Sequence, residues 1–232
     1  MVDGRRNPLL QLLLPEQCSL CRAPAAAPVC APCRAELPWN RLACPLCARP
    51  QETGPAYVCG ACAQAPPPFD SAWSAFRYAA PIDRAVQGLK YHAGFRGGRW
   101  LGEEMARELA RRPQPLPGLL LPVPLHHGRL RRRGYNQALE LARALGRMLS
   151  IEVDAGLARR IRPTADQIGR TAPERRRNVK GAFTVDAAPL RGVHLALVDD
   201  VMTTGSTLAE LARVCRKAGA ARIEVWTAAR AE

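Results

Sequence analysis

The sequence predicts an α/β protein in which a parallel sheet with flanking helices follows a small cysteine-rich module. Eight of the nine cysteines lie before residue 63, and a proline-rich linker, residues 64–68 (QAPPP), follows them. After this linker, strand-like apolar runs alternate with helix-like amphipathic segments, which is typical of a parallel sheet covered by helices. We therefore expect a double cysteine module with a short N-terminal helix in residues 1–66 and an α/β domain in residues 67–232.

The first residues of the chain only partly match a signal peptide. Arg5 and Arg6 precede a short apolar stretch, residues 9–14, which is interrupted by Gln11 and leads into cysteines instead of a small-residue cleavage site. We expect this stretch to form a short amphipathic helix that packs on the protein. No apolar run approaches the roughly 18–20 residues of a membrane span, so we expect a cytoplasmic location.

The early cysteines form four CxxC pairs, with the spacing of a tight turn that directs two sulfur atoms at one metal ion. The pairs are Cys18 and Cys21, Cys30 and Cys33, Cys44 and Cys47, and Cys59 and Cys62. Two such turns complete a tetrahedral zinc site, so the module predicts two structural Zn²⁺ ions. Sequential pairing joins the first two pairs in one site and the last two in the other, and an interleaved pairing fits the spacing too.

A disulfide framework and redox chemistry are alternative uses of these cysteines. A disulfide framework needs an oxidising compartment, for which the chain carries no export signal, and four evenly repeated pairs are hard to explain as redox motifs. We therefore favour zinc. A closed Cys₄ site leaves no position for a substrate, which favours a structural or docking role, and the metal would supply folding energy to so short a module. The ninth cysteine, Cys215, lies on the apolar face of an expected helix, which indicates a core position.

The part of the chain after the linker contains seven segments with regular periodicity. Apolar runs and alternating patterns predict strands over 72–78, 119–123, 193–198 and 223–228. Leucine and methionine at helical spacing predict helices over 100–111, 138–149 and 207–218. This order of strands and helices favours a sheet whose strands run parallel.

The positive charge of the chain is concentrated in the same part. The formal net charge is +14, and 28 of the 34 lysines and arginines follow residue 70. Arginine clusters lie at 129–133, 159–162 and 170–180. Such a field attracts a nucleic acid or a small phosphorylated substrate, although a solvated arginine-rich surface would have the same composition. The low aromatic content, 5%, weakens any function that is built on base stacking.

The most informative segment is 195–211, LALVDDVMTTGSTLAEL. Its apolar strand ends in two carboxylates, Asp199 and Asp200, at the position where open α/β sheets bind ligands. A loop that is rich in hydroxyl groups then opens a helix and consists of Thr203, Thr204, Gly205, Ser206 and Thr207. Free amides and hydroxyls at a helix start bind anions. The segment therefore predicts a site for a phosphorylated sugar, with phosphate on the loop and sugar hydroxyls on the carboxylates.

Each part of this segment also has a simpler explanation. A threonine-rich turn before a helix is usually a cap, and paired acids at a strand end often face solvent. Their combination in this order is what favours a phosphate site. The segment lacks the GK[ST] of a Walker A loop and the GxGxxG of a dinucleotide site.

Residues 198–207 resemble the motif with which type I phosphoribosyltransferases bind 5-phosphoribosyl-1-pyrophosphate (PRPP). The whole chain resembles the ComF family, which joins an N-terminal double zinc ribbon to a type I phosphoribosyltransferase-like domain. The resemblance also covers 122–125 (PVPL), 133–137 (RGYNQ), Gln167, Arg177 with Asn178, and 181–183 (GAF).

This resemblance implies a role for each part of the site. Asp199 and Asp200 would be catalytic residues that hold the ribose 2′ and 3′ hydroxyls, and the loop 203–207 would clasp the 5-phosphate. Mg²⁺ would bridge the pyrophosphate and the ribose hydroxyls. Residues 167–180 would form a loop that closes over the substrate. The ligands of the pyrophosphate would be Arg131, Arg132 and Arg133.

The resemblance leaves two functions open, and a third follows from the zinc module. In the first, the chain is an enzyme that transfers phosphoribose to an unidentified acceptor. In the second, it is a non-catalytic protein of DNA uptake and competence, with single-stranded DNA and a DNA-uptake helicase as partners. The third is a docking adaptor that works through its zinc ribbons. No residue of the sequence identifies the acceptor or a general base.

Overall fold

The computed structural model describes residues 17–91, 95–163 and 172–231. The chain divides into two compact units, Met1–Leu37 and Pro38–Glu232. The N-terminal helix expected at residues 9–14 and the motif residue Gln167 lie outside the described residues. The second half of the cysteine module thus belongs to the same unit as the sheet. That residues 1–66 and 67–232 fold as separate domains, as the composition indicates, stays a prediction.

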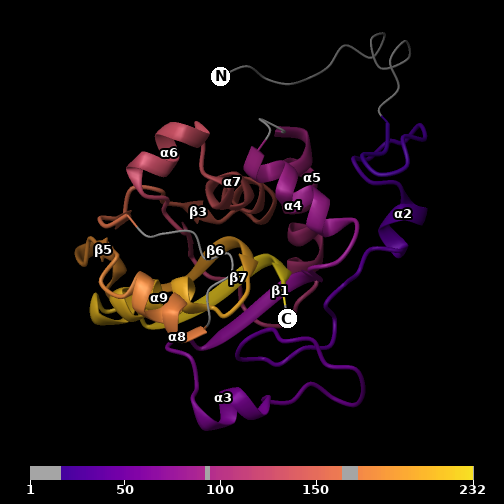
Figure 1. The fold of residues 1–232 in the computed structure, drawn as a ribbon. Helices are drawn as coiled ribbons and strands as arrows, with labels where there is room; N and C mark the ends of the chain where they lie inside the picture. The colour runs from indigo at the N-terminus through magenta and orange to yellow at the C-terminus, as the bar shows by residue number, and fades with distance from the viewer. Residues whose placement is uncertain (1–16, 92–94, 164–171, 232) are drawn as a thin grey trace. The chain divides into compact units, whose positions relative to one another are not determined.

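The elements are labelled in chain order (Figure 1). The described part of the unit Met1–Leu37 contains helix α2 (Ala31–Ala35). The helices of the unit Pro38–Glu232 are α3 (Gly60–Gln64), α4 (Ile82–Tyr91), α5 (Phe95–Leu109), α6 (His127–Arg133), α7 (Gln137–Leu149), α8 (Ala172–Val179), α9 (Ser206–Lys217) and the 3₁₀ turn η1 (Ala188–Leu190). Its strands are β1 (Ser71–Arg77), β2 (Leu119–Pro122), β3 (Glu152–Val153), β4 (Ala158–Arg160), β5 (Phe183–Val185), β6 (His194–Met202) and β7 (Arg222–Arg230).

Five strands form one parallel sheet in the order β1-β7-β6-β2-β3, and β4 and β5 form an antiparallel pair. The predicted strands and helices are confirmed, with shifts at their ends. Strand β6 continues past its predicted end at Val198 because β7 stays beside it, with Asp199 opposite Thr227 and Met202 opposite Arg230. The expected fold class, a parallel sheet with flanking helices, is therefore confirmed.

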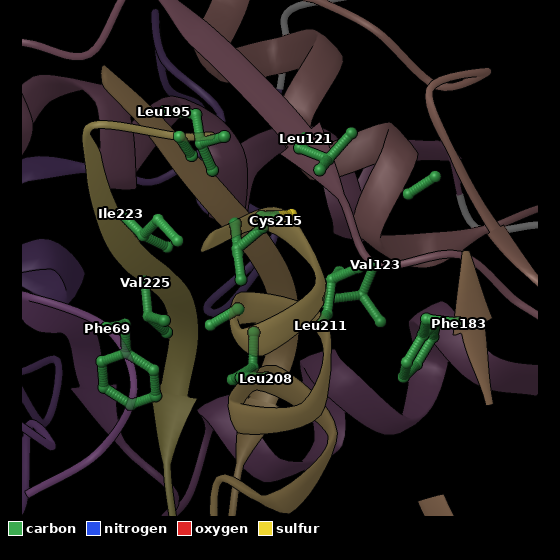
Figure 2. Packing of buried hydrophobic residues seen from close by; sticks show 14 of the residues in the cluster. Phe69, Leu121, Val123, Phe183, Leu195, Leu208, Leu211, Cys215, Ile223 and Val225 are labelled. Carbon is green, nitrogen blue, oxygen red and sulfur yellow. The ribbon is translucent and has the colours of Figure 1, made fainter. Parts of the chain in front are cut away.

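Helices cover both faces of the sheet. Helices α5 and α7 lie on one face, with α4 against α5, and α9 lies on the other face (Figure 1). The apolar residues of α9 repeat at helical spacing, and Leu208, Leu211 and Cys215 pack in one cluster with Ile223 and Val225 of β7 (Figure 2). Burial raises the pKa of the Cys215 thiol to about 12, and this cysteine is a core residue, as predicted. None of the described helices has both the length and the apolar character that a membrane span requires.

The connection between β2 and α7 is held by Asn136. Its side chain accepts a hydrogen bond from Ala138 N (3.1 Å) at the start of α7 and donates one to the Val123 carbonyl (3.0 Å) just after β2. One residue thus caps the helix and fixes the end of the strand. Helix α6, which lies between these two anchors in the chain, is therefore carried at the carboxyl end of β2.

Residues 38–51, which include the first cysteine pair of the second cluster, lie along β1 at the edge of the sheet. Ala72 N in β1 donates to the Pro45 carbonyl (2.9 Å). Ala48 is buried and belongs to the main hydrophobic cluster. An open sheet edge presents backbone groups to other chains, and a covering loop prevents this. The second cysteine cluster is therefore built into the same unit as the sheet.

A buried ionic cluster surrounds Glu224 near the amino end of β7. Glu224 is 1% exposed and accepts two hydrogen bonds from Arg112 (2.6 and 3.1 Å) and one from Trp226 Nε1 (3.0 Å). His194 Nε2 lies 3.0 Å from the same carboxylate. Burial alone would raise the pKa of Glu224, but Arg112 and Trp226 outweigh it and hold the pKa below its ordinary value. The carboxylate is therefore kept ionised inside the protein by its donors.

Candidate functional site

The two predicted carboxylates lie at the carboxyl end of β6, next to the carboxyl end of β2. Asp200 N donates to Asp199 Oδ1 (2.9 Å), and Val201 N donates to Asp200 Oδ1 (2.7 Å). Both side chains are half-buried. The backbone bonds orient the two carboxylates, which can accept hydrogen bonds from hydroxyl groups and can bind hard cations.

The phosphate loop, residues 203–207, begins directly after β6 and leads into α9. Gly205 is the N-cap of α9 and has a left-handed backbone (φ 71°), which glycine adopts without strain. A Cβ at this position would lie 3.4 Å from Met202 Sδ. Thr204 Oγ1 and Ser206 Oγ are 2.8 Å apart and share a hydrogen bond. The loop therefore brings hydroxyl groups together with the first amides of a helix, and this arrangement suits an anion.

An arginine from another element contacts the phosphate loop. Arg175 Nη1 of α8 donates to Thr203 Oγ1 (2.8 Å). The described part of the segment 167–180, which we expect to close over a substrate, contains the helix Ala172–Val179 and ends in a turn. The sequence assigned no individual role to Arg175, and its only signal was membership of an arginine cluster. Its charge adds to the attraction of the loop for an anion.

A cavity of about 240 Å³ lies beyond the carboxyl end of β2. It is lined by His126, Gly128, Arg129, Arg132, Arg160 and Pro163. Of the three arginines predicted to hold pyrophosphate, Arg132 lines this cavity, whereas Arg131 and Arg133, although described, lie outside its lining. Arg129 lies within one helical turn of both Arg132 and Arg133 in α6, and of these two only Arg132 reaches the lining.

Arg160 reaches the cavity from β4, which pairs with β5. Its guanidinium lies 5.3 Å from the ring centre of Phe183. Burial and Arg129 lower the pKa of Arg160, whereas Asp199 raises it. Because the charge of Asp199 acts on this guanidinium, the cavity lies within electrostatic reach of the carboxylate pair.

The cavity is electropositive. His126 Nδ1 accepts a hydrogen bond from Gly128 N (3.3 Å) and caps α6. Burial and the neighbouring His127 and arginines lower the pKa of His126 below its ordinary 6.5, which favours the neutral imidazole. Among the described residues, the lining contains three guanidinium groups and no carboxylate. Guanidinium groups engage phosphate oxygens two at a time, so the cavity suits a phosphate-type anion.

The cysteines form two clusters, each of four sulfur atoms that lie within 4.8 Å of one another. The first cluster is Cys18, Cys21, Cys30 and Cys33, and the second is Cys44, Cys47, Cys59 and Cys62. The pairing is therefore sequential. The sulfurs of Cys21 and Cys30 are 3.7 Å apart, and those of Cys47 and Cys59 are 3.6 Å apart. These distances match the roughly 3.8 Å edge of a tetrahedron whose Zn–S bonds are about 2.3 Å long, so each cluster fits a closed Cys₄ zinc site.

Backbone amides favour the thiolate form of one cysteine in each cluster, Cys18 in the first and Cys59 in the second. Burial would raise the pKa of Cys18, but amide donors led by Cys30 outweigh it and lower the pKa to about 6. The same competition, with the Cys62 amide as the main donor, lowers the pKa of Cys59 to about 7. Zinc binds the thiolate form, so these amides prepare Cys18 and Cys59 for the metal.

Comparison with known proteins covers nearly the whole chain. Residues 9–63 match the family of the double zinc ribbon domain. The chain is 36% identical over 222 residues to the DNA utilization protein YhgH of Escherichia coli (strain K12) and to that of Salmonella typhi. Each alignment covers 93% of this chain and 97% of the relative. It is 39% identical over 188 residues to competence protein F of Haemophilus influenzae, and this alignment covers 76% of this chain and 80% of that protein.

Solved structures of phosphoribosyl chemistry align with part of the chain. The glutamine PRPP amidotransferase from B. subtilis aligns with a TM-score of 0.42 at 15% identity, over 61% of this chain and 30% of that chain. A purine phosphoribosyltransferase from Pyrococcus horikoshii Ot3 aligns with a TM-score of 0.31 at 18% identity, over 65% of this chain and 82% of that chain. Both scores are low, and the fold class rests on the order and register of the strands.

Proposed function

Since this chain belongs to the ComF family, together with the DNA utilization proteins YhgH and competence protein F, we propose that it binds PRPP with Mg²⁺ and transfers the phosphoribosyl group to an acceptor. One observation carries this proposal. The carboxylate pair, the phosphate loop and the arginine-lined cavity all belong to the carboxyl edge of one sheet. Open α/β sheets bind their ligands at this edge.

Each part of PRPP has a chemical counterpart at this edge. The amides and hydroxyls of the phosphate loop suit the 5-phosphate, and Arg175 adds a positive charge there. The carboxylates of Asp199 and Asp200 suit the ribose hydroxyls, which donate hydrogen bonds. The pyrophosphate suits the cavity, whose guanidinium groups belong to Arg129, Arg132 and Arg160.

Mg²⁺ fits the oxygen-rich side of the site. It prefers carboxylate and phosphate oxygens and usually binds through one or two carboxylates together with substrate phosphates. Asp199 and Asp200 are the residues that would hold it, because their backbone bonds already orient both carboxylates. When bound, Mg²⁺ would neutralise part of the charge on the departing pyrophosphate.

Transfer breaks the bond between ribose C1 and the pyrophosphate oxygen and forms a bond from C1 to the acceptor nucleophile. Positive charge develops on the sugar ring in the transition state, and the carboxylates of Asp199 and Asp200 stabilise it. The electron pair of the broken bond leaves with pyrophosphate, whose charge the arginines of the cavity stabilise. The chain thus contributes positioning and complementary charge.

PRPP with Mg²⁺ is expected to stabilise the wild-type protein against thermal unfolding. At about 100 times its dissociation constant, PRPP adds about 2.7 kcal/mol to the free energy of unfolding. The double variant Asp199→Asn, Asp200→Asn should lose this gain. A neutral amide is a weaker ligand of Mg²⁺ than a carboxylate and a weaker acceptor for the ribose hydroxyls. Differential scanning fluorimetry measures the shift, and pyrophosphate release with a panel of bases and amines measures turnover.

The variant Asp83→Asn is the control, since it removes a carboxylate from the first turn of α4 that belongs neither to the carboxylate pair nor to the phosphate loop or the cavity lining. It should keep the full PRPP shift. Absence of any shift in the wild type, or an equal shift in the Asp199→Asn, Asp200→Asn variant, would exclude PRPP binding at this edge. A full shift without pyrophosphate release above that of the double variant would argue against transfer to the acceptors tried.

A second candidate function is the handling of single-stranded DNA. Two observations favour it: most of the +14 charge follows residue 70, and the relatives are named for DNA utilization and competence. Arg131 and Arg133 lie outside the cavity lining and are the arginines of α6 available for a nucleic-acid backbone. We propose them as phosphate contacts, and a DNA-uptake helicase partner stays a prediction.

The affinity for single-stranded DNA is expected to fall as salt rises, with a log–log slope of roughly −0.7 per phosphate contact. Changing Arg131 and Arg133 to alanine should make the slope shallower by about 1.4, since two contacts are lost. Fluorescence anisotropy of a labelled oligonucleotide over a salt series measures both slopes. The control Arg111→Ala, Arg143→Ala removes the same charge from arginines that pair with Glu108 and Glu140. A flat wild-type slope, or the same change in the control, would count against this function.

A further inference from the structure

Arg230, the last residue of β7, joins the second cysteine cluster to the end of β6. Arg230 is 6% exposed, and its guanidinium donates hydrogen bonds to three backbone carbonyls. Nε donates to the Cys47 carbonyl (2.9 Å), and Nη1 donates to the Met202 carbonyl (3.1 Å) and to that of Ala231. One buried side chain therefore holds two segments that are far apart in the sequence.

The first of these segments is part of a zinc site. Cys47 ends the CPLC turn of the second cluster, and its sulfur lies 3.6 Å from that of Cys59. A Cys₄ zinc site carries excess negative charge, so the buried guanidinium and the cluster stabilise each other.

The second segment is the start of the phosphate loop. Met202 is the last residue of β6, and Thr203 follows it directly. The Met202 carbonyl also accepts a hydrogen bond from Ala231 N (3.0 Å), and Met202 Sδ lies against Gly205. The position of Met202 therefore decides where the loop begins and how Gly205 is supported beneath it.

We propose that Arg230 is a positioning residue that transmits the state of the second zinc cluster to the phosphate loop. With zinc bound, the CPLC turn fixes the position of the Cys47 carbonyl. This carbonyl fixes the guanidinium of Arg230, which fixes the Met202 carbonyl through its second hydrogen bond. Without zinc, the loop loses this support and its affinity for a 5-phosphate falls. The choice of a 5-phosphate as the ligand rests on the proposed function, whereas the positioning of the loop by Arg230 does not.

Arginine is suited to this task because its planar fork holds two or more acceptors in a fixed geometry. A lysine has one terminal nitrogen on a flexible stem and cannot reproduce the fork. The first cluster belongs to the unit Met1–Leu37 and supplies none of the carbonyls that Arg230 contacts. The two clusters, although alike in sequence, are therefore expected to differ in their effect on the site.

The test compares Arg230→Gln and Arg230→Lys with the wild type. Zinc content, hydrogen–deuterium exchange of the amides at 203–207 without ligand, and the Kd for PRPP with Mg²⁺ are measured on the full chain. Both variants should retain two zinc ions. Arg230→Gln should exchange these amides faster and bind PRPP about tenfold more weakly, as expected for the loss of a charged hydrogen bond. Arg230→Lys should fall between Arg230→Gln and the wild type.

Arg222→Gln is the matched control, because Arg222 begins the same strand at its opposite end. It should leave exchange and PRPP affinity unchanged. A second comparison uses two double variants, each of which lacks two zinc-binding cysteines of one cluster. The variant Cys59→Ser, Cys62→Ser should speed exchange at 203–207, and the variant Cys18→Ser, Cys21→Ser should not.

Wild-type exchange at 203–207 in Arg230→Gln, with two zinc ions retained, would overturn the proposal. An equal effect of Arg222→Gln would overturn it as well. If Arg230→Gln fails to fold, the amide exchange of Arg230→Lys at 203–207 is the test: faster exchange than in the wild type supports the proposal, and wild-type exchange overturns it. If the wild type does not bind PRPP, the proposed function fails, and the exchange measurements still decide the role of Arg230.

Discussion

Chelation of zinc from the first cluster is expected to unfold the unit Met1–Leu37. Its described residues bury little, since only Cys18, Val29 and Leu37 among them are fully buried. Helix α2 buries none of its residues. Structural zinc contributes about 10–16 kcal/mol to the folding of comparable peptides, which is more than so small a core can replace.

The measurement combines zinc stoichiometry with hydrogen exchange. The native protein should contain two zinc ions, and a strong chelator should release both and abolish the protection of residues 17–37. The second cluster is anchored along β1, so strands β6 and β7 should remain protected. Cys215→Ala is the control and should retain both ions, because Cys215 lies outside the clusters. Protection of residues 17–37 after complete zinc removal, or disulfides in place of zinc, would refute this expectation.

Replacement of Glu224 by alanine is expected to cost about 3–5 kcal/mol of stability. The carboxylate is buried and accepts hydrogen bonds from Arg112 and Trp226. Its removal leaves the partly buried Arg112 cation without this partner, and breaking a buried ion pair by removing one member costs this much. Urea unfolding followed by circular dichroism measures the change.

The control for this prediction is Glu108→Ala. Glu108 pairs with Arg111, whose side chain is 75% exposed, and an exposed pair contributes at most about 1 kcal/mol. A loss in Glu224→Ala no larger than that of the control would show that the buried cluster adds little to stability.

The depressed pKa of Glu224 also has a signed effect on stability against pH. The unfolded chain binds a proton to this carboxyl near its ordinary pKa of 4.5, while the folded protein binds it only at a lower pH. The stability that Glu224 contributes is therefore present above pH 4.5 and is lost as pH falls through the folded pKa. The acid limb of the stability profile should be less steep in Glu224→Gln.

Local sequence patterns predicted the parts of this protein that are contiguous in the chain. The CxxC pairs, the strands of the sheet and the run from Asp199 to the start of α9 all depend on neighbours within a few residues. Helical spacing places Arg129 within one turn of both Arg132 and Arg133 in α6, so it does not indicate which arginines line the cavity. The structure places Arg129 and Arg132 in the cavity lining and Arg131 and Arg133 outside it.

By itself, the sequence determined the α/β class, the cysteine module and the segment that suits a phosphate, because periodicity and residue order encode them directly. Only the tertiary structure decided which cysteines cluster together, that Arg160 lines the cavity and Arg175 contacts Thr203, and that Arg230 links the second cluster to the end of β6. Cys47 and Arg230 are separated by 183 positions. Contacts of this kind arise when the sheet brings distant strands together, and no local pattern along the chain records them.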